Sequence, residues 1–147
     1  MKIEKIAGTL ISVKNIDETV KFFSDLLGIT FEEVPPDIKR IKTITKYADP
    51  AAEVVKMRIA ISPTGLELVE TDPPPEKEGL RSVMFKVPDL EQAKADMQKK
   101  GVRLIADIKL GGLKEALFRA DDLHGTRVAL VEYNTPTVME AIKSVRG

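Results

Sequence analysis

The spacing of apolar residues in the first half of the chain changes from that of a strand to that of a helix and back. Residues 6–13 form an apolar run of strand length. Helical spacing follows, beginning behind a capping residue, Asp17, and ending at Gly28. The apolar positions of this helix are Ile16, Val20, Phe23 and Leu27. Strand patterns return at residues 29–34, 57–62 and 66–71. The pattern therefore predicts the order βαβββ.

A proline-rich segment, residues 73–79, separates this half from a second half with the same pattern. Consecutive prolines remove backbone donors and restrict their neighbours to extended shapes, so this segment is predicted to be a linker. Beyond it we expect a strand over 82–87, a helix over 89–100 that stops at Gly101, and strands over 102–110, 115–120 and 127–133. The similarity of residues 13–17 to residues 87–91 supports a duplication. The pattern predicts one α+β domain over 1–147, built from two βαβββ modules at 4–72 and 80–134.

Two segments lie outside this repeat. The connection over residues 36–55 is long for a compact domain, and such loops are usually a lid, a partner surface or a hidden extra strand. A final helix is predicted over residues 135–146, where it covers a sheet edge or meets a second chain. Its apolar face consists of Val138, Met139, Ala141, Ile142 and Val145.

Composition and charge exclude several classes of function. The chain has 147 residues, enough for one domain, and it has no cysteine for disulfides, thiolate ligands or a cysteine nucleophile. Its 23 basic residues balance 23 acidic ones, so neither nucleic acid nor an anionic membrane is an expected partner. Residues 1–5 are too charged for a signal peptide, and no apolar run approaches the roughly 20 residues of a membrane span. We expect a cytoplasmic protein whose partners are small molecules or proteins.

Four segments carry a resemblance to a known family. They are residues 13–17, 25–28, 66–70 and 121–128. Together they resemble the recurring signatures of the vicinal oxygen chelate (VOC) superfamily, which includes glyoxalase I, methylmalonyl-CoA epimerase, extradiol dioxygenases and the bleomycin resistance proteins. The resemblance extends from the first strand to Tyr133. It implies curved mixed sheets around a ligand cleft and a homodimer, but one scaffold of this kind hosts many chemistries.

The resemblance also implies where a divalent metal would lie. Family enzymes hold the ion in the cleft with side chains from the first and fourth strands of each half, and the ion stabilises an enolate or oxyanion. The matching positions in this chain are Gly8, Glu67, Ser82 and Ala129. Glycine and alanine offer no side-chain donor, and a neutral serine is a poor ligand. No cofactor is therefore predicted, and a divalent metal would be held only weakly, by Glu67 and water.

Glu67 is the candidate catalytic residue. Period-two geometry places it on the same strand face as Val69, and the resemblance makes that face the cavity. If it is buried there, its pKa rises and the carboxyl can serve as a general acid or base. The alternative is a solvated or ion-paired strand residue, with Arg127 or Lys86 as its partner. Glu70 alternates to the opposite face and is expected to be exposed.

Further side chains are expected to bind the ligand because their strand positions face the cleft. They are Leu10, Ser12, Val69, Ser82, Met84, Lys86, Arg127, Val131 and Tyr133. The polar ones can bind an oxyanion or carboxylate, or they line a wet crevice without a specific role. His124, the only histidine, precedes Gly125 in a turn and is expected at the surface. The core is expected to hold Phe22, Phe23, Phe31, Phe85 and Phe118.

Three functions remain open. The first is binding of a small organic ligand without the usual divalent metal, as bleomycin-type resistance proteins bind by sequestration. The second is an isomerase, epimerase or lyase that uses Glu67 for proton transfer next to a carbonyl. The third is a protein-interaction module with a vestigial cleft, whose contacts come from residues 36–55 and the last helix. Patterning does not choose between a cleft within one chain and a cleft shared by two chains, because both bury the same strand faces.

Overall fold

The computed structural model describes residues 1–48 and 56–146. Within these ranges the chain forms nine strands and three α-helices. They are β1 (Lys5–Val13), α1 (Ile16–Leu27), β2 (Glu32–Glu33), β3 (Arg40–Ile44), β4 (Lys56–Ile61), β5 (Leu66–Asp72), β6 (Gly79–Lys86), α2 (Leu90–Lys99), β7 (Leu104–Leu110), β8 (Leu113–Phe118), β9 (Val128–Glu132) and α3 (Val138–Lys143). None of the helices in the described ranges is long and apolar enough to cross a membrane.

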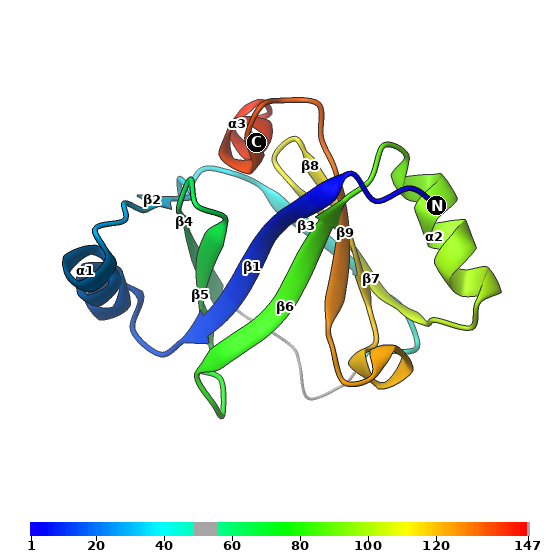
Figure 1. Cartoon of the computed structure of the whole chain (residues 1–147), viewed down its shortest axis with the longest axis horizontal. Helices are drawn as coiled ribbons and strands as arrows, with labels where there is room; N and C mark the ends of the chain where they lie inside the picture. Colours follow the sequence, from blue (N-terminus) through cyan, green and yellow to red (C-terminus); the bar gives the residue numbers. More distant parts are fainter. Residues whose placement is uncertain (49–55, 147) are drawn as a thin grey trace.

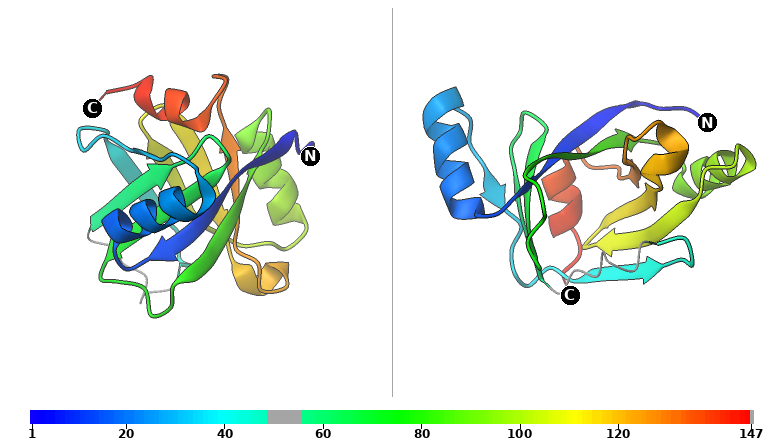
Figure 2. Two further views of the ribbon diagram at one scale, coloured as in Figure 1. Left: turned by 60° about the vertical axis from the view of Figure 1, so that its left-hand side comes forward. Right: turned by 90° about the horizontal axis from the view of Figure 1, so that it is seen from below.

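The nine described strands form one mixed sheet. Their order is β2-β4-β5-β1-β6-β9-β8-β7-β3, and the two halves meet where β1 pairs antiparallel with β6. In each half the first strand runs parallel to the last, β1 beside β5 and β6 beside β9. The sheet is curled, and α1 and α2 lie on its outer side at opposite ends of the molecule (Figures 1 and 2). The predicted α+β fold of two βαβββ modules with a curved mixed sheet is confirmed.

The two edge strands of this sheet are neighbours in the sequence, which requires the sheet to curl. β2 pairs with β4 in the first half, whereas β3 pairs with β7 in the second half, with Arg40 opposite Leu110. Only residues 34–39 join the two edges, and a link of that length spans at most about 25 Å. Pro35 and Pro36 interrupt the strand because proline cannot donate to a ladder. The chain therefore leaves the first half and continues as β3 beside the second.

The passage of the chain from the first half to the second bears on two predicted elements. The strand predicted over 29–34 is wrong for most of its length, since only Glu32–Glu33 pairs within the sheet. Of the three interpretations of residues 36–55, the hidden extra strand is confirmed for Arg40–Ile44. Residues 49–55 of that predicted connection lie outside the described residues.

Both halves attach their helix to the outer face of the sheet in the same way. The backbone N–H of Ile16 donates to Oε2 of Glu70 at 2.8 Å, and the N–H of Leu90 donates to Oε1 of Glu132 at 2.9 Å. These bonds satisfy N–H groups in the first turn, which have no partner within the helix. The expectation that Glu70 is exposed is wrong: it is partly buried, because α1 packs over the face to which Glu70 points.

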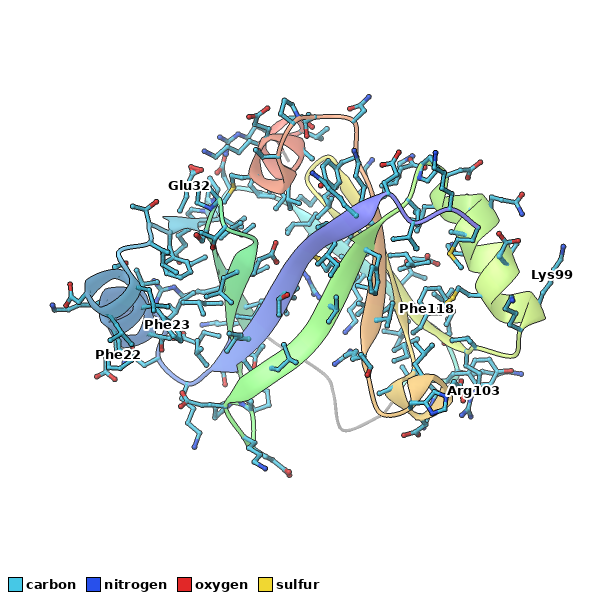
Figure 3. The ribbon with its side chains drawn as sticks, viewed as in Figure 1. Phe22, Phe23, Glu32, Lys99, Arg103 and Phe118 are labelled. Atoms are coloured by element: carbon cyan, nitrogen blue, oxygen red, sulfur yellow. The ribbon has the colours of Figure 1, made fainter. Side chains whose placement is uncertain are left out.

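The outer core lies beneath these two helices. Phe118 is fully buried under α2 together with Leu130, while Phe23 packs against the buried Val13 under α1 (Figure 3). Phe22 and Leu27 are 61% and 56% exposed, so their predicted burial is wrong. The helical period places Phe22 on the side of α1 that faces away from the sheet, whereas Leu27 is the last residue of the helix.

α3 covers one end of the curled sheet (Figure 2). It buries Val138 and Ile142 against the inner face, in the same cluster as Met84. A Cβ at Gly111, in the turn between β7 and β8, would collide with the carbonyl of Ile142, so only glycine permits this contact. The helix is shorter than the predicted 135–146, and Val145 is 46% exposed rather than part of its buried face.

Other boundaries shift by one to three residues. β6 begins at Gly79, so the predicted linker ends earlier and the strand includes Leu80 and Arg81. β8 begins at Leu113 rather than at residue 115, because the turn is confined to Gly111 and Gly112.

Candidate ligand-binding site

A cavity lies inside the curl, with walls from both halves of one chain. Its lining residues are Leu10, Arg40, Met57, Ile59, Ile61, Glu67, Val69, Arg81, Ser82, Met84, Ile108, Leu110, Leu113, Glu115, Leu117, Arg127, Val138 and Ile142. The centres of water-sized molecules have about 50 Å³ to occupy there, and a single water needs roughly 10–15 Å³. The cavity therefore has room for a small ligand or for one group of a larger ligand.

A second hollow adjoins the first beside the crossing segment. It gives water-sized molecules about 150 Å³ and is lined in part by Pro35 and Pro36. The two hollows share the side chains of Arg40, Met57, Ile59 and Leu110. A ligand longer than the inner cavity can therefore extend along this boundary.

Glu67 lies on β5 and lines the cavity. It is 4% exposed, and among the described residues it has no ion-pair partner, since Lys86 instead approaches Glu4 at 3.4 Å. Burial, and secondarily the negative charge of Glu115, raises the pKa of Glu67 to about 8. The carboxyl is thus mostly protonated at neutral pH and can donate a hydrogen bond. Glu67 is therefore not ion-paired with Arg127 or Lys86, the alternative considered from the sequence.

Four basic side chains lie near Glu115, and the three arginines among them line the same cavity. This basic cluster consists of Arg40, Lys42, Arg81 and Arg127. Burial lowers the pKa of each, and the pKa of Arg81 falls to about 10 because neighbouring guanidinium groups repel its charge as well. Glu115 faces the cluster from β8, where burial raises its pKa while the four cations oppose that rise.

Strand alternation does not find most of this cluster. Leu10 is opposite Ser82 while Ile11 is opposite Leu80, so Arg81 is the extra residue of a bulge in β6. The bulge allows the adjacent residues Arg81 and Ser82 both to line the cavity. Arg40 and Lys42 depend on β3, and the alternation of basic and apolar residues over 40–42 is the one signal in the sequence that points to this strand.

The structure brings together part of the predicted ligand-binding set. Leu10, Val69, Ser82, Met84 and Arg127 line the cavity. The residues that do not line it are Ser12, Lys86, Val131 and Tyr133.

The four side chains outside the cavity are engaged elsewhere. Val131 is fully buried and Ser12 is 7% exposed. Nζ of Lys86 lies 4.5 Å from the centroid of the Tyr133 ring, in a cation–π contact. Period-two alternation predicts the face of the sheet to which a side chain points. It does not predict how far along the curled sheet that side chain lies from the cavity.

His124 lies at the surface, as predicted. It is exposed and follows a 3-10 turn at Ala120–Leu123. Its φ of 55° places it in the left-handed region that turn residues use.

The sequence of the chain matches a known family over most of its length. The family model of the Glyoxalase/Bleomycin resistance protein/Dioxygenase superfamily matches residues 9–118. The chain belongs to this superfamily. The resemblance to the VOC superfamily seen in the sequence motifs is thereby confirmed. No curated protein sequence matches the chain.

Solved structures with a similar fold include methylmalonyl-CoA epimerases. A Streptomyces coelicolor methylmalonyl-CoA epimerase variant in complex with 2-nitronate-propionyl-CoA has 18% sequence identity and a TM-score of 0.65, covering 91% of this chain and 100% of that chain. The Mycobacterium tuberculosis methylmalonyl-CoA epimerase has 15% identity and a TM-score of 0.63, covering 90% of each chain. A hypothetical protein from Bacillus halodurans C-125 has 17% identity and a TM-score of 0.67, covering 90% and 96%. At these identities the likeness shows a shared fold.

The four positions that the resemblance matches to metal ligands do not fit a divalent ion. A Cβ at Gly8 would lie 3.0 Å from Cε of Met84 and 3.3 Å from Oε1 of Glu67, so the space beside Gly8 is already filled. Ala129, opposite Met84 on the neighbouring strand, has no donor atom in its side chain. Within residues 1–48 and 56–146, no three His, Cys, Asp or Glu side chains are grouped closely enough to hold a metal. Glu67 and the hydroxyl of Ser82 are a poor donor set by themselves.

Proposed function

We propose that this chain binds a small organic ligand in its inner cavity without a divalent metal at the superfamily position. The observation that carries this proposal is the buried carboxyl of Glu67 among apolar side chains such as Leu10, Val69 and Met84. Concave, mostly apolar walls with a few polar groups are typical of small-molecule sites. The space beside Gly8 is already filled and offers no place for an ion. This supports binding of the ligand by the side chains of the cavity, without a metal.

Glu67 gives such a site its polar anchor. Because its pKa is about 8, the protonated carboxyl can donate a hydrogen bond to a carbonyl or carboxylate oxygen of the ligand at neutral pH. In the cavity this bond forms away from bulk water, where a hydrogen bond is electrostatically stronger. An unpaired polar group in the same place costs about 1–3 kcal/mol, which penalises ligands that lack an acceptor.

A thermal-shift screen tests this proposal. The protein, kept in EDTA, is screened against 2-oxo acids, acyl-CoA thioesters and antibiotics, because a ligand at about 100 times its Kd stabilises by roughly 2.7 kcal/mol. We expect hits that Glu67→Gln weakens and that Glu76→Gln, a change at an exposed glutamate, leaves unaltered. A screen without hits, or hits that depend on added divalent metal, would contradict the proposal.

A second candidate is an isomerase or epimerase that uses Glu67 as its proton-transfer group. Two observations favour it: the pKa of about 8, which lies near the working pH of a general base, and the fold shared with an epimerase solved in complex with methylmalonyl-CoA. In such a reaction the Glu67 carboxylate takes the proton from the carbon beside the thioester carbonyl. The C–H electron pair then passes into the carbonyl as an enolate, and a proton returns to the carbon.

Deuterium exchange distinguishes the two candidates. Methylmalonyl-CoA incubated with the protein in D₂O is followed by NMR, and an enzyme would exchange the proton next to the carbonyl. The rate should rise with pH through about 8, as Glu67 ionises, and should be lost in Glu67→Gln. Ligand binding without exchange would favour the binding protein.

A further inference from the structure

The arginines at the cavity differ from all other arginines of the chain. Arg58, Arg103, Arg119 and Arg146 each form an ion pair with a carboxylate, at N···O distances of 2.6–3.0 Å. No described carboxylate lies within 4.0 Å of the guanidinium group of Arg40, Arg81 or Arg127. The cavity thus collects the arginines whose charge no described side chain pairs directly.

Holding these positive charges together in a partly buried cavity is electrostatically unfavourable. Burial and mutual repulsion both disfavour the charged form of Arg81, and Lys42 is repelled by all three cavity arginines. Glu115 is the one carboxylate that acts on the whole basic cluster, so four cations face one potential anion. An additional negative group in the cavity would offset this repulsion.

The geometry of the cluster also specifies the type of group. Guanidinium groups present planar pairs of N–H donors that match the oxygens of carboxylate and phosphate groups. Arg40, Arg81 and Arg127 all line the inner cavity, where the centres of water-sized molecules have about 50 Å³ to occupy. A compact oxyanion fits this space better than an extended or planar aromatic group.

We propose that the basic cluster is a binding subsite for an oxyanion, the carboxylate or phosphate group of the ligand. This inference rests on the proposed function, since it assigns one end of the ligand bound in the same cavity as Glu67. The ligand is then a small organic acid or phosphate, with its charged group at the basic cluster and a neutral acceptor at Glu67. Ser82, adjacent to Arg81 on the cavity wall, offers a further hydroxyl donor to the ligand.

Inorganic phosphate and succinate are the probes for this subsite. The melting temperature is measured against the concentration of each anion at pH 7, with sodium chloride keeping the ionic strength constant. The wild type should be stabilised by at least one of them in a saturable manner. A response to phosphate alone assigns a phosphate-bearing ligand, and a response to succinate alone assigns a carboxylic acid. No response to either overturns the inference.

Charge variants locate the binding. Arg81→Gln and Arg127→Gln should each weaken the apparent Kd by about tenfold or more, as expected for loss of one charge in a partly buried site. Arg146→Gln makes the same change of charge at a residue paired with Asp37 on the surface, and should leave the Kd within about twofold. Equal binding in the cavity variants and in Arg146→Gln would overturn the inference.

Two further variants keep the test decisive. Glu115→Gln should bind the anion at least as tightly as the wild type, and weaker binding would contradict the proposed charge balance. If a Gln variant does not fold, Arg81→Lys retains the charge but not the planar donor pair, and should still weaken binding by about threefold.

The same variants separate this inference from the proposed function. Organic ligands that depend on Glu67 but not on Arg81 would leave the proposed function standing and remove the oxyanion subsite. Arginine-dependent binding of phosphate or succinate, without any organic ligand sensitive to Glu67→Gln, would do the reverse.

Discussion

Replacing Glu67 by Gln should change how the stability of the protein depends on pH. The pKa of Glu67 is about 8 in the folded protein, against an ordinary value of 4.5. Between these values the folded state keeps a proton that the unfolded chain releases. The free energy of unfolding therefore falls as pH rises through this window, and the loss is complete above about pH 8.

The size of this effect follows from the separation of the two pKa values. At 1.36 kcal/mol per pH unit, the stability lost through Glu67 relative to low pH is about 3 kcal/mol at pH 7 and levels off at about 5 kcal/mol above pH 8. Gln has the shape of a protonated Glu but nothing to titrate. The variant should match the wild type at pH 4.5 and exceed its stability increasingly at higher pH.

Urea unfolding from pH 4.5 to pH 9 measures this difference. Wild type, Glu67→Gln and the exposed control Glu76→Gln are compared at each pH, with equal m-values as the check that the unfolding reaction is unchanged. The difference between wild type and Glu67→Gln should grow with pH, and the control should show no such trend. A difference that is constant with pH, or one that favours the wild type at pH 8, would refute the buried and protonated state of Glu67.

Other predictions concern the walls and supports of the site. Gly8→Ala should destabilise the protein by about 1–3 kcal/mol in urea unfolding, because its Cβ would press on Met84 at 3.0 Å; unchanged stability would show that the space beside Gly8 is open. Glu70→Gln should cost about 0.5–2 kcal/mol by weakening the bond to the first turn of α1, whereas a neutral effect would contradict that role. In an NMR titration Asp122 should have a pKa of about 2, because Arg103 donates to it from its side chain and its backbone. The stabilisation from this pair is present above the unfolded pKa of 3.8 and lost as pH falls through about 2, so a midpoint near 3.8 would show the pair to be absent in solution.

The repeated architecture and the position of Glu67 could be predicted from local patterns. The stop of α1 at Gly28 is confirmed, but its cap is Asn15, which accepts from the N–H of Glu18, and not the predicted Asp17; both ends depend on interactions within one turn. The direction of Glu67 follows from alternation along β5, which has no irregularity in its pairing with β1. Where the ladder is regular, period-two geometry transfers directly from sequence to structure.

The remainder of the site depends on features that alternation does not contain. The bulge at Arg81 reverses the direction of one side chain, and it arises from the pairing of β6 with β1 rather than from either strand alone. The place of Arg40 depends on a crossing from one half of the sheet to the other. Tyr133 faces inward as expected but lies near the end covered by α3, because alternation specifies a face and not a depth.

Metal content is the most direct test of the claim that the cavity works without a divalent ion. Purified protein is incubated with Zn²⁺, Ni²⁺, Mn²⁺, Fe²⁺ and Mg²⁺ in turn, desalted, and analysed for each element. The filled space beside Gly8 and the poor donor set of Glu67 and Ser82 predict far less than one ion per chain. Retention of one ion per chain, and its loss in Glu67→Gln, would contradict the account.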